Sequence, residues 1–110
     1  MKRMILVAAV GMLAGCASVP GLREGKPDVT LHTAKSPADY GACIASGWGQ
    51  FFGVSVNHSA TPDGGYTVSM PDAYTGNNGV ADISKRGDVQ VHYRLRFGSG
   101  KFTKVVNGCK

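Results

Sequence analysis

The spacing of apolar residues predicts one amphipathic helix that begins at Ser36 and ends near Trp48. Ser36 is a suitable N-cap, Pro37 suits the first helical position, and Asp39 completes a capping-box pattern. The positions that repeat at the spacing of one helical face are Tyr40, Cys43, Ile44, Gly47 and Trp48. The glycines that follow limit the helix, so we expect it to stop at about Trp48.

After this helix, the period of the apolar pattern changes from 3.6 to 2, which predicts strands. The expected strands are centred on Phe52 to Val56, Tyr66 to Met70, Val80 to Ser84 and Val89 to Phe97. In the last strand, Val89, Val91, Tyr93, Leu95 and Phe97 alternate with Gln90, His92, Arg94 and Arg96. The first set is expected to face the core and the second to face solvent, as in an antiparallel sheet with one buried face.

These elements predict an α+β fold in which one amphipathic helix packs on a four-stranded antiparallel meander. The helix is the only predicted element able to cover the apolar face of the sheet. Near the C-terminus, apolar residues at helical spacing favour a short helical turn over Lys101 to Val106, although their β-branched side chains weaken helix formation.

Between Ala17 and about Lys35, no apolar periodicity extends over the whole segment. Pro20, Gly21, Gly25 and Pro27 interrupt it, so we interpret the segment as a flexible tether. The alternation from Val29 to Thr33 leaves open an additional edge strand.

The first sixteen residues have the order of a bacterial lipoprotein signal. Lys2 and Arg3 precede an apolar run from Met4 to Leu13, which is too short to span a bilayer as a stable helix. The run leads into Leu13-Ala14-Gly15-Cys16, which resembles the lipobox, where the cysteine sulfur receives the diacylglycerol. We therefore expect a signal peptide over 1–15, a lipidated flexible tether over 16–35 and one globular domain over 36–110.

Lipidation of Cys16 would bind the chain to a membrane through acyl chains such as palmitate. Two or more chains anchor a protein stably, whereas one chain binds only marginally. Ala17 follows the cysteine where an aspartate would stand in an inner-membrane lipoprotein. By resemblance to lipoprotein sorting in Gram-negative bacteria, this implies the outer membrane, with the side that the domain faces left open.

The cysteines that remain after lipidation are Cys43 and Cys109, and they allow one pairing in an oxidising periplasm. Their separation fits no metal motif. The predicted disulfide would join the apolar face of the helix, where Cys43 is expected to be buried, to the C-terminal tail.

Several segments together resemble a family of small proteobacterial outer-membrane lipoproteins of unknown function, some of them noted as antigens. The segments are Ser36-Pro37, Cys43-Ile44-Ala45 with Trp48, Gly65-Tyr66-Thr67-Val68-Ser69, Val80-Ala81-Asp82-Ile83, Tyr93-Arg94-Leu95-Arg96-Phe97 and Val106-Asn107-Gly108-Cys109. The resemblance supports the disulfide and implies no activity.

Composition restricts the function further. The 110 residues suffice for one small domain, and the net charge of +5 includes Lys2 and Arg3 of the signal. The remaining ten basic and seven acidic residues give +3, which does not indicate a nucleic-acid-binding protein. The three histidines are too scattered to predict a metal site, and no catalytic motif or phosphate-binding loop is present, so we expect neither enzyme activity nor a cofactor.

One group of cations is a candidate binding surface. His92, Arg94 and Arg96 share the predicted solvent-facing side of the last strand, and Lys85 and Arg86 lie in the preceding turn. Such a surface could bind phosphates of lipopolysaccharide, carboxylates of peptidoglycan or an acidic envelope protein. The alternative is a solvated face that only maintains solubility.

Two functions from different classes remain open. The first is a non-catalytic envelope lipoprotein with a binding or structural role. The second is a periplasmic inhibitor of a host or rival hydrolase, which should present a projecting loop. The candidate for that loop is Pro71 to Asn78, which contains Tyr74.

Overall fold

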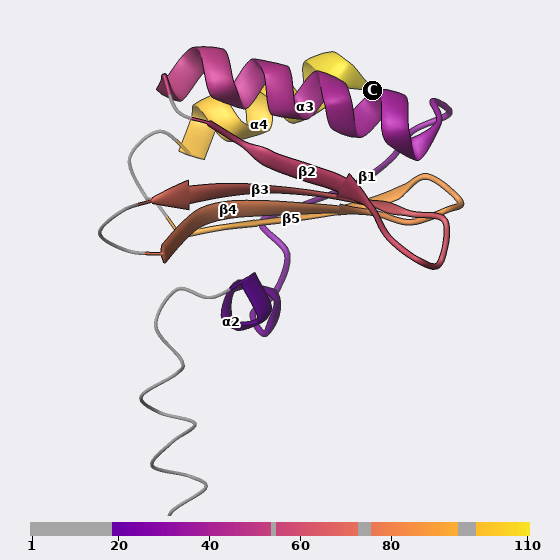
Figure 1. Ribbon diagram of the computed structural model, residues 1–110, viewed down its shortest axis with the longest axis horizontal. Helices are drawn as coiled ribbons and strands as arrows, with labels where there is room; N and C mark the ends of the chain where they lie inside the picture. Colours follow the sequence, from indigo (N-terminus) through magenta and orange to yellow (C-terminus); the bar gives the residue numbers. More distant parts are fainter. Residues whose placement is uncertain (1–18, 54, 73–75, 95–98) are drawn as a thin grey trace, which may run out of the picture.

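The computed structural model describes residues 19–53, 55–72, 76–94 and 99–110. They form an α+β fold in which two long helices cover one face of an antiparallel sheet and a short helix lies on the other (Figure 1). In chain order, the elements are α2 (Val19–Arg23), β1 (Val29–His32), α3 (Pro37–Phe52), β2 (Asn57–Ala60), β3 (Tyr66–Asp72), β4 (Gly76–Ile83), β5 (Asp88–Tyr93) and α4 (Ser99–Cys109).

The sheet has five strands in the order β1-β5-β4-β3-β2, and every neighbouring pair is antiparallel. The predicted α+β class is therefore confirmed, but the predicted number of four strands is wrong. The additional strand is β1, which pairs with β5 in a register that sets Val29 opposite Val91. The alternation from Val29 to Thr33 was its signal.

Helix α3 begins as predicted and extends one turn further than predicted. The Ser36 hydroxyl accepts a hydrogen bond from the Asp39 amide at 3.2 Å, and the helix ends at Gly53, whose φ of 64° suits a residue without a side chain. Phe52 therefore lies in the helix, where its ring packs 4.8 Å from that of Phe102. The strand expected over Phe52 to Val56 is wrong, and β2 follows it instead.

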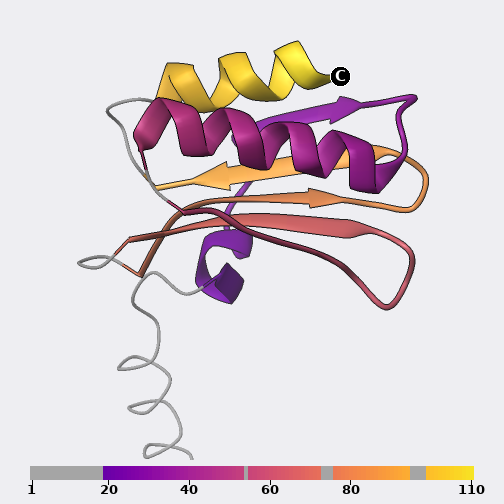
Figure 2. The ribbon, with the colours of Figure 1, turned by 45° about the horizontal axis from the view of Figure 1, so that its top comes forward.

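The C-terminal turn expected over Lys101 to Val106 is a longer helix, α4. Its Phe102, Val105, Val106 and Cys109 are all buried. Figure 2 shows α3 and α4 side by side over the same face of the sheet. The close approach of these helices depends on Gly47, because a Cβ there would lie 2.5 Å from a methyl carbon of Val105. Burial of this apolar face outweighs the weak helix propensity of the sequence.

The core lies between the sheet and these two helices. Val89 and Val91 are buried with Ile44 and Trp48, as predicted. Tyr93 is partly buried and stacks on Phe102 at 5.3 Å, whereas Leu95 and Phe97 lie outside the described residues. Tyr40 is also buried, donates a hydrogen bond to the Val106 carbonyl at 2.6 Å, and has its pKa raised to about 12 by burial.

Candidate functional site

Residues 19–32, which we call the N-terminal arm, reach the second face of the sheet through α2 and extend the sheet at its edge through β1. The arm contains α2 and β1 and lies against β4 and β5 (Figure 1). Beyond the pairing of β1 with β5, the carboxylate of Asp28 accepts a hydrogen bond from the Tyr93 amide at 2.8 Å. The expectation of a flexible tether is wrong over Val19–His32, because backbone pairing and side-chain contacts hold this segment on the sheet.

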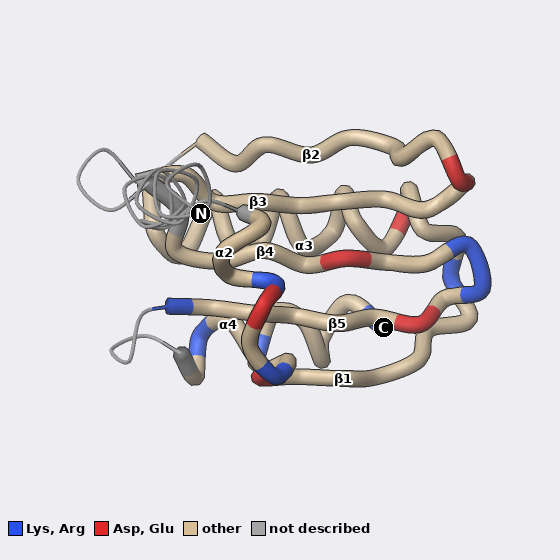
Figure 3. Tube along the Cα trace, turned by 90° about the horizontal axis from the view of Figure 1, so that it is seen from below, with Lys and Arg blue, Asp and Glu red and all other residues tan. Residues whose placement is uncertain are grey.

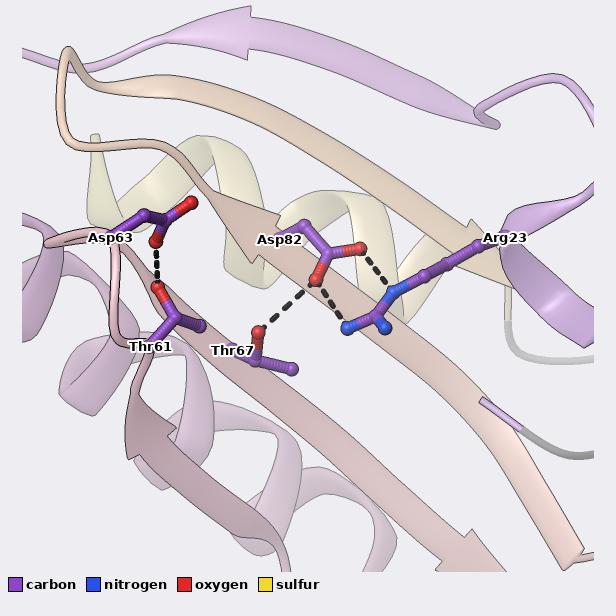
Figure 4. A network of polar contacts seen from close by, with 5 residues as sticks. All are labelled: Arg23, Thr61, Asp63, Thr67 and Asp82. Carbon is purple, nitrogen blue, oxygen red and sulfur yellow. Dashed lines mark hydrogen bonds and ion pairs between the residues drawn. The ribbon is translucent and has the colours of Figure 1, made fainter. Parts of the chain in front are cut away.

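A bidentate ion pair joins the arm to β4. The guanidinium of Arg23 donates to the two carboxylate oxygens of Asp82 at 2.8 and 2.6 Å, and Thr67 donates to the same carboxylate at 3.1 Å (Figure 4). No local pattern predicted this ion pair, because its members are 59 residues apart.

His92, on β5, is buried under the arm. Its exposed fraction is 4%, and its Nε2 lies 3.0 Å from the carbonyl oxygen of Gly25, to which it can donate. Val80 on β4 is buried as well, although it shares this face of the sheet with Asp82. His92 and Val80 are therefore inaccessible because the arm covers them, which the alternation of the strand cannot indicate.

The predicted basic surface is not formed as expected. His92 is buried, Arg94 is exposed, and Arg96 lies outside the described residues. Lys85 and Arg86 are exposed in the turn before β5, and Arg94 follows its end, so about 20 Å of strand separates them. Figure 3, which views this face, also shows acidic positions on β4 and β5. The prediction of a continuous basic row through His92 is therefore wrong.

Beside the arm, the same face has a shallow groove of about 260 Å³ with a polar lining. The lining residues are Thr61, Asp63, Tyr66, Thr67, Asp82, Ile83, Ser84, Asp88 and Gln90. Asp63 accepts hydrogen bonds from the Thr61 hydroxyl and from the Gly65 amide, and these bonds lower the pKa of its carboxyl group. These contacts tie the turn between β2 and β3 together (Figure 4).

The carboxylates of this groove already have protein partners. Asp82 binds Arg23 and Thr67, Asp63 binds its own turn, and Asp88 lies 3.2 Å from the imidazole of His32. The groove therefore resembles a structural network that fixes the hairpins and the arm.

The disulfide joins α3 to α4. The Sγ atoms of Cys43 and Cys109 are 2.05 Å apart, and their Cα atoms are separated by 5.8 Å, within the range expected of a bridge. Cys109 is buried, but Cys43 is exposed, so the expected burial of Cys43 is wrong. The reason is that α4 lies beside α3, and the bridge closes the outer side of their contact.

The loop proposed for an inhibitor is mostly a hairpin. Pro71 and Asp72 belong to β3 and pair with Asn77 and Gly76 of β4. Tyr74 lies outside the described residues, as does Cys16 with the residues before it that resemble a lipobox. The bounds predicted for the loop, Pro71 to Asn78, are therefore wrong at both ends, because β3 extends to Asp72 and β4 begins at Gly76.

Neither a metal site nor a membrane span is found in the described part of the chain. Its His, Cys, Asp and Glu side chains form no group of three that could hold a metal ion. Among the same residues, no helix combines the length and apolar character that crossing a bilayer requires. In comparisons with known proteins, the chain matches no family model, no curated protein and no solved structure.

Proposed function

We propose that this chain is a lipid-anchored protein of the bacterial envelope with a non-catalytic, binding or structural role. The observation that carries the proposal is the order of the first sixteen residues, in which a basic start, an apolar run and small residues lead to Cys16. By resemblance to lipoprotein sorting, Ala17 favours the outer membrane over the inner one.

The N-terminal arm supports this role because it makes the anchor short. The first described element begins at Val19, and in the sequence only Ala17 and Ser18 separate this residue from the proposed lipid on Cys16. Three residue steps span at most about 10 Å. A domain attached in this way would be held close to the membrane surface, with the arm and its face of the sheet directed toward the lipid.

The fixed arm favours a structural or binding role close to the membrane over capture of distant partners. A long tether would let the domain search a large volume, whereas the arm is fastened by β1 pairing, Arg23–Asp82 and the contact of His92 with Gly25.

Metabolic labelling of the full chain with an alkyne fatty acid tests the anchor. The unmodified chain should incorporate the label, and Cys16→Ser should abolish incorporation and leave the precursor at full length. The matched control is Cys43→Ser, which removes another cysteine and should retain the label. Incorporation into the Cys16→Ser chain, or none into the unmodified chain, contradicts the proposal.

Membrane fractionation tests the location. The labelled chain should sediment with outer-membrane density, and Ala17→Asp should shift it to the inner-membrane fraction. The proposed outer-membrane location is wrong if the unmodified chain is already found in the inner membrane.

A further inference from the structure

Strand β2 is an edge of the sheet with free hydrogen-bonding groups. In the described part of the chain it pairs on one side only, with β3, and all four of its residues are exposed. The Thr61 amide donates to Gly65 across this hairpin at 3.0 Å. Since bonded pairs alternate along an antiparallel ladder, His58 and Ala60 direct their N–H and C=O groups outward, away from β3.

The edge at β2 lacks the residues that usually prevent pairing with another strand. Its sequence Asn57-His58-Ser59-Ala60 has no charged residue of the Lys, Arg, Asp or Glu type and no proline. Protective residues flank both edges of the sheet, because Lys26, Pro27 and Asp28 precede β1 and Pro62 and Asp63 follow β2 after Thr61. A strand added at β2 can therefore pair only along the four residues of β2 itself.

Helix α3 leaves room beside this edge. A hollow of about 390 Å³ lies between α3 and the start of β2, and the α3 residues that line it are small or polar: Ala42, Ala45, Ser46, Gly49 and Gln50. Val56 and His58 line its other side. This part of the α3 surface leaves space for the side chains of a strand that is added to β2 on the same face of the sheet.

We propose that two copies of this chain associate through β2, strand to antiparallel strand, and join their two five-stranded sheets into one. One register uses the outward N–H and C=O groups of His58 and Ala60 in both copies. In this register, His58 of one copy lies opposite Ala60 of the other, and Ser59 lies opposite Ser59 of the other copy. Each His58–Ala60 pair then exchanges two backbone hydrogen bonds. A second copy fits because an uncharged strand meets no like charge when it pairs with itself.

Symmetry gives a further reason for a second copy. Antiparallel pairing of identical edges places the two-fold axis perpendicular to the joined sheet, so equivalent faces of both sheets point the same way. The α3 and α4 layers then share one side, and both N-terminal arms share the other (Figure 1). Two lipid anchors could therefore enter one membrane. This step rests on the proposed function, whereas the strand pairing does not.

Cysteine cross-linking in membranes tests the pairing in the full chain. At the two-fold axis, the Ser59 positions form a non-hydrogen-bonded pair with Cα atoms about 4.5 Å apart, which a disulfide can span. Ser59→Cys should give mostly a reducible species of twice the chain mass after mild oxidation. The matched control is Thr30→Cys, which is exposed on the same face of the other edge strand and should remain monomeric.

A charge at the axis provides a second test that does not depend on a new thiol. Ser59→Lys sets two like charges opposite each other and should convert the purified protein from dimer to monomer in sedimentation experiments. Thr30→Lys should leave the dimer mass unchanged. Trp48 fluorescence verifies that each variant is folded, and Ser59→Thr should retain the dimer.

The results separate this proposal from the proposed function. Equal cross-linking of both cysteine variants, a cross-link to a protein of another mass, a dimer that survives Ser59→Lys or a monomeric unmodified chain overturns the pairing. Fatty-acid labelling is measured on the same samples. A lipidated monomer refutes the pairing alone, and an unlipidated dimer refutes the anchor alone.

Discussion

Reduction of the disulfide between Cys43 and Cys109 should lower the free energy of unfolding substantially while leaving the native fold in place. The bridge joins residues 66 apart in the sequence. The chain-entropy model assigns about 4 kcal/mol to a closed loop of this length, because the bridge restricts the unfolded chain. Small domains have a total stability of about 5–15 kcal/mol, so the expected loss is a large share.

The native fold should survive reduction because α4 has other attachments. Phe102, Val105 and Val106 are buried, and the Tyr40 hydroxyl donates to the Val106 carbonyl. Lys35 donates to the Cys109 carbonyl at 2.6 Å. Since Cys43 is exposed, opening the bridge removes little packing from the core.

Urea titration of the oxidised and reduced protein, followed by fluorescence of Trp48, measures the effect. The urea concentration at the unfolding midpoint should fall on reduction. The slope of the free energy of unfolding against urea concentration should increase, because the reduced unfolded chain exposes more surface. Cys43→Ser and Cys109→Ser should each lower the free energy of unfolding by the amount that the bridge contributes. The double variant should lower it by the same amount, because only one bridge is lost. Loss of the native Trp48 signal without denaturant would refute the reasoning, as would a decrease below about 1 kcal/mol.

Two further predictions concern the core. Phe102→Ala should cost about 3–5 kcal/mol, because the ring is fully buried against Trp48 and Phe52, whereas Phe51→Ala, at a ring that is 46% exposed, should cost far less in the same titration. Tyr40 should make the protein sensitive to alkali, because its pKa is raised from 10.0 to about 12 in the folded state. The unfolded chain loses the phenol proton first, so stability should decline by about 1.4 kcal/mol per pH unit over this interval. Tyr40→Phe should abolish that decline, and an unchanged pH profile would contradict the assigned cause.

The candidate site was only partly predictable, and His92 shows the reason. Strand alternation places His92 on the face opposite the core, and β5 has that register. Whether that face is exposed to solvent depends on the N-terminal arm, whose contacts join residues distant in sequence, such as Gly25 and His92. The ion pair of Arg23 and Asp82 likewise joins two residues that are distant in the sequence. Local patterns do not encode contacts of this range.

The sequence by itself determined the features that depend on neighbouring residues. Capping at Ser36, the helical spacing from Tyr40 to Trp48, the inward Val89 and Val91 and the α+β class follow from local hydrogen bonding and periodicity. The pairing of Cys43 with Cys109 was also predicted from the sequence, and the structure has this bridge.

The tertiary structure decided where the elements end and what covers each face. Helix α3 reaches Phe52 because Phe102 of α4 lies beneath its last turn, and α4 is long because α3 and the sheet bury its apolar side. The N-terminal arm folds onto the sheet although its own periodicity is weak, because β5 provides a partner for β1. In each case, burial and pairing with distant residues outweigh local preferences that amount to only about 1 kcal/mol per residue.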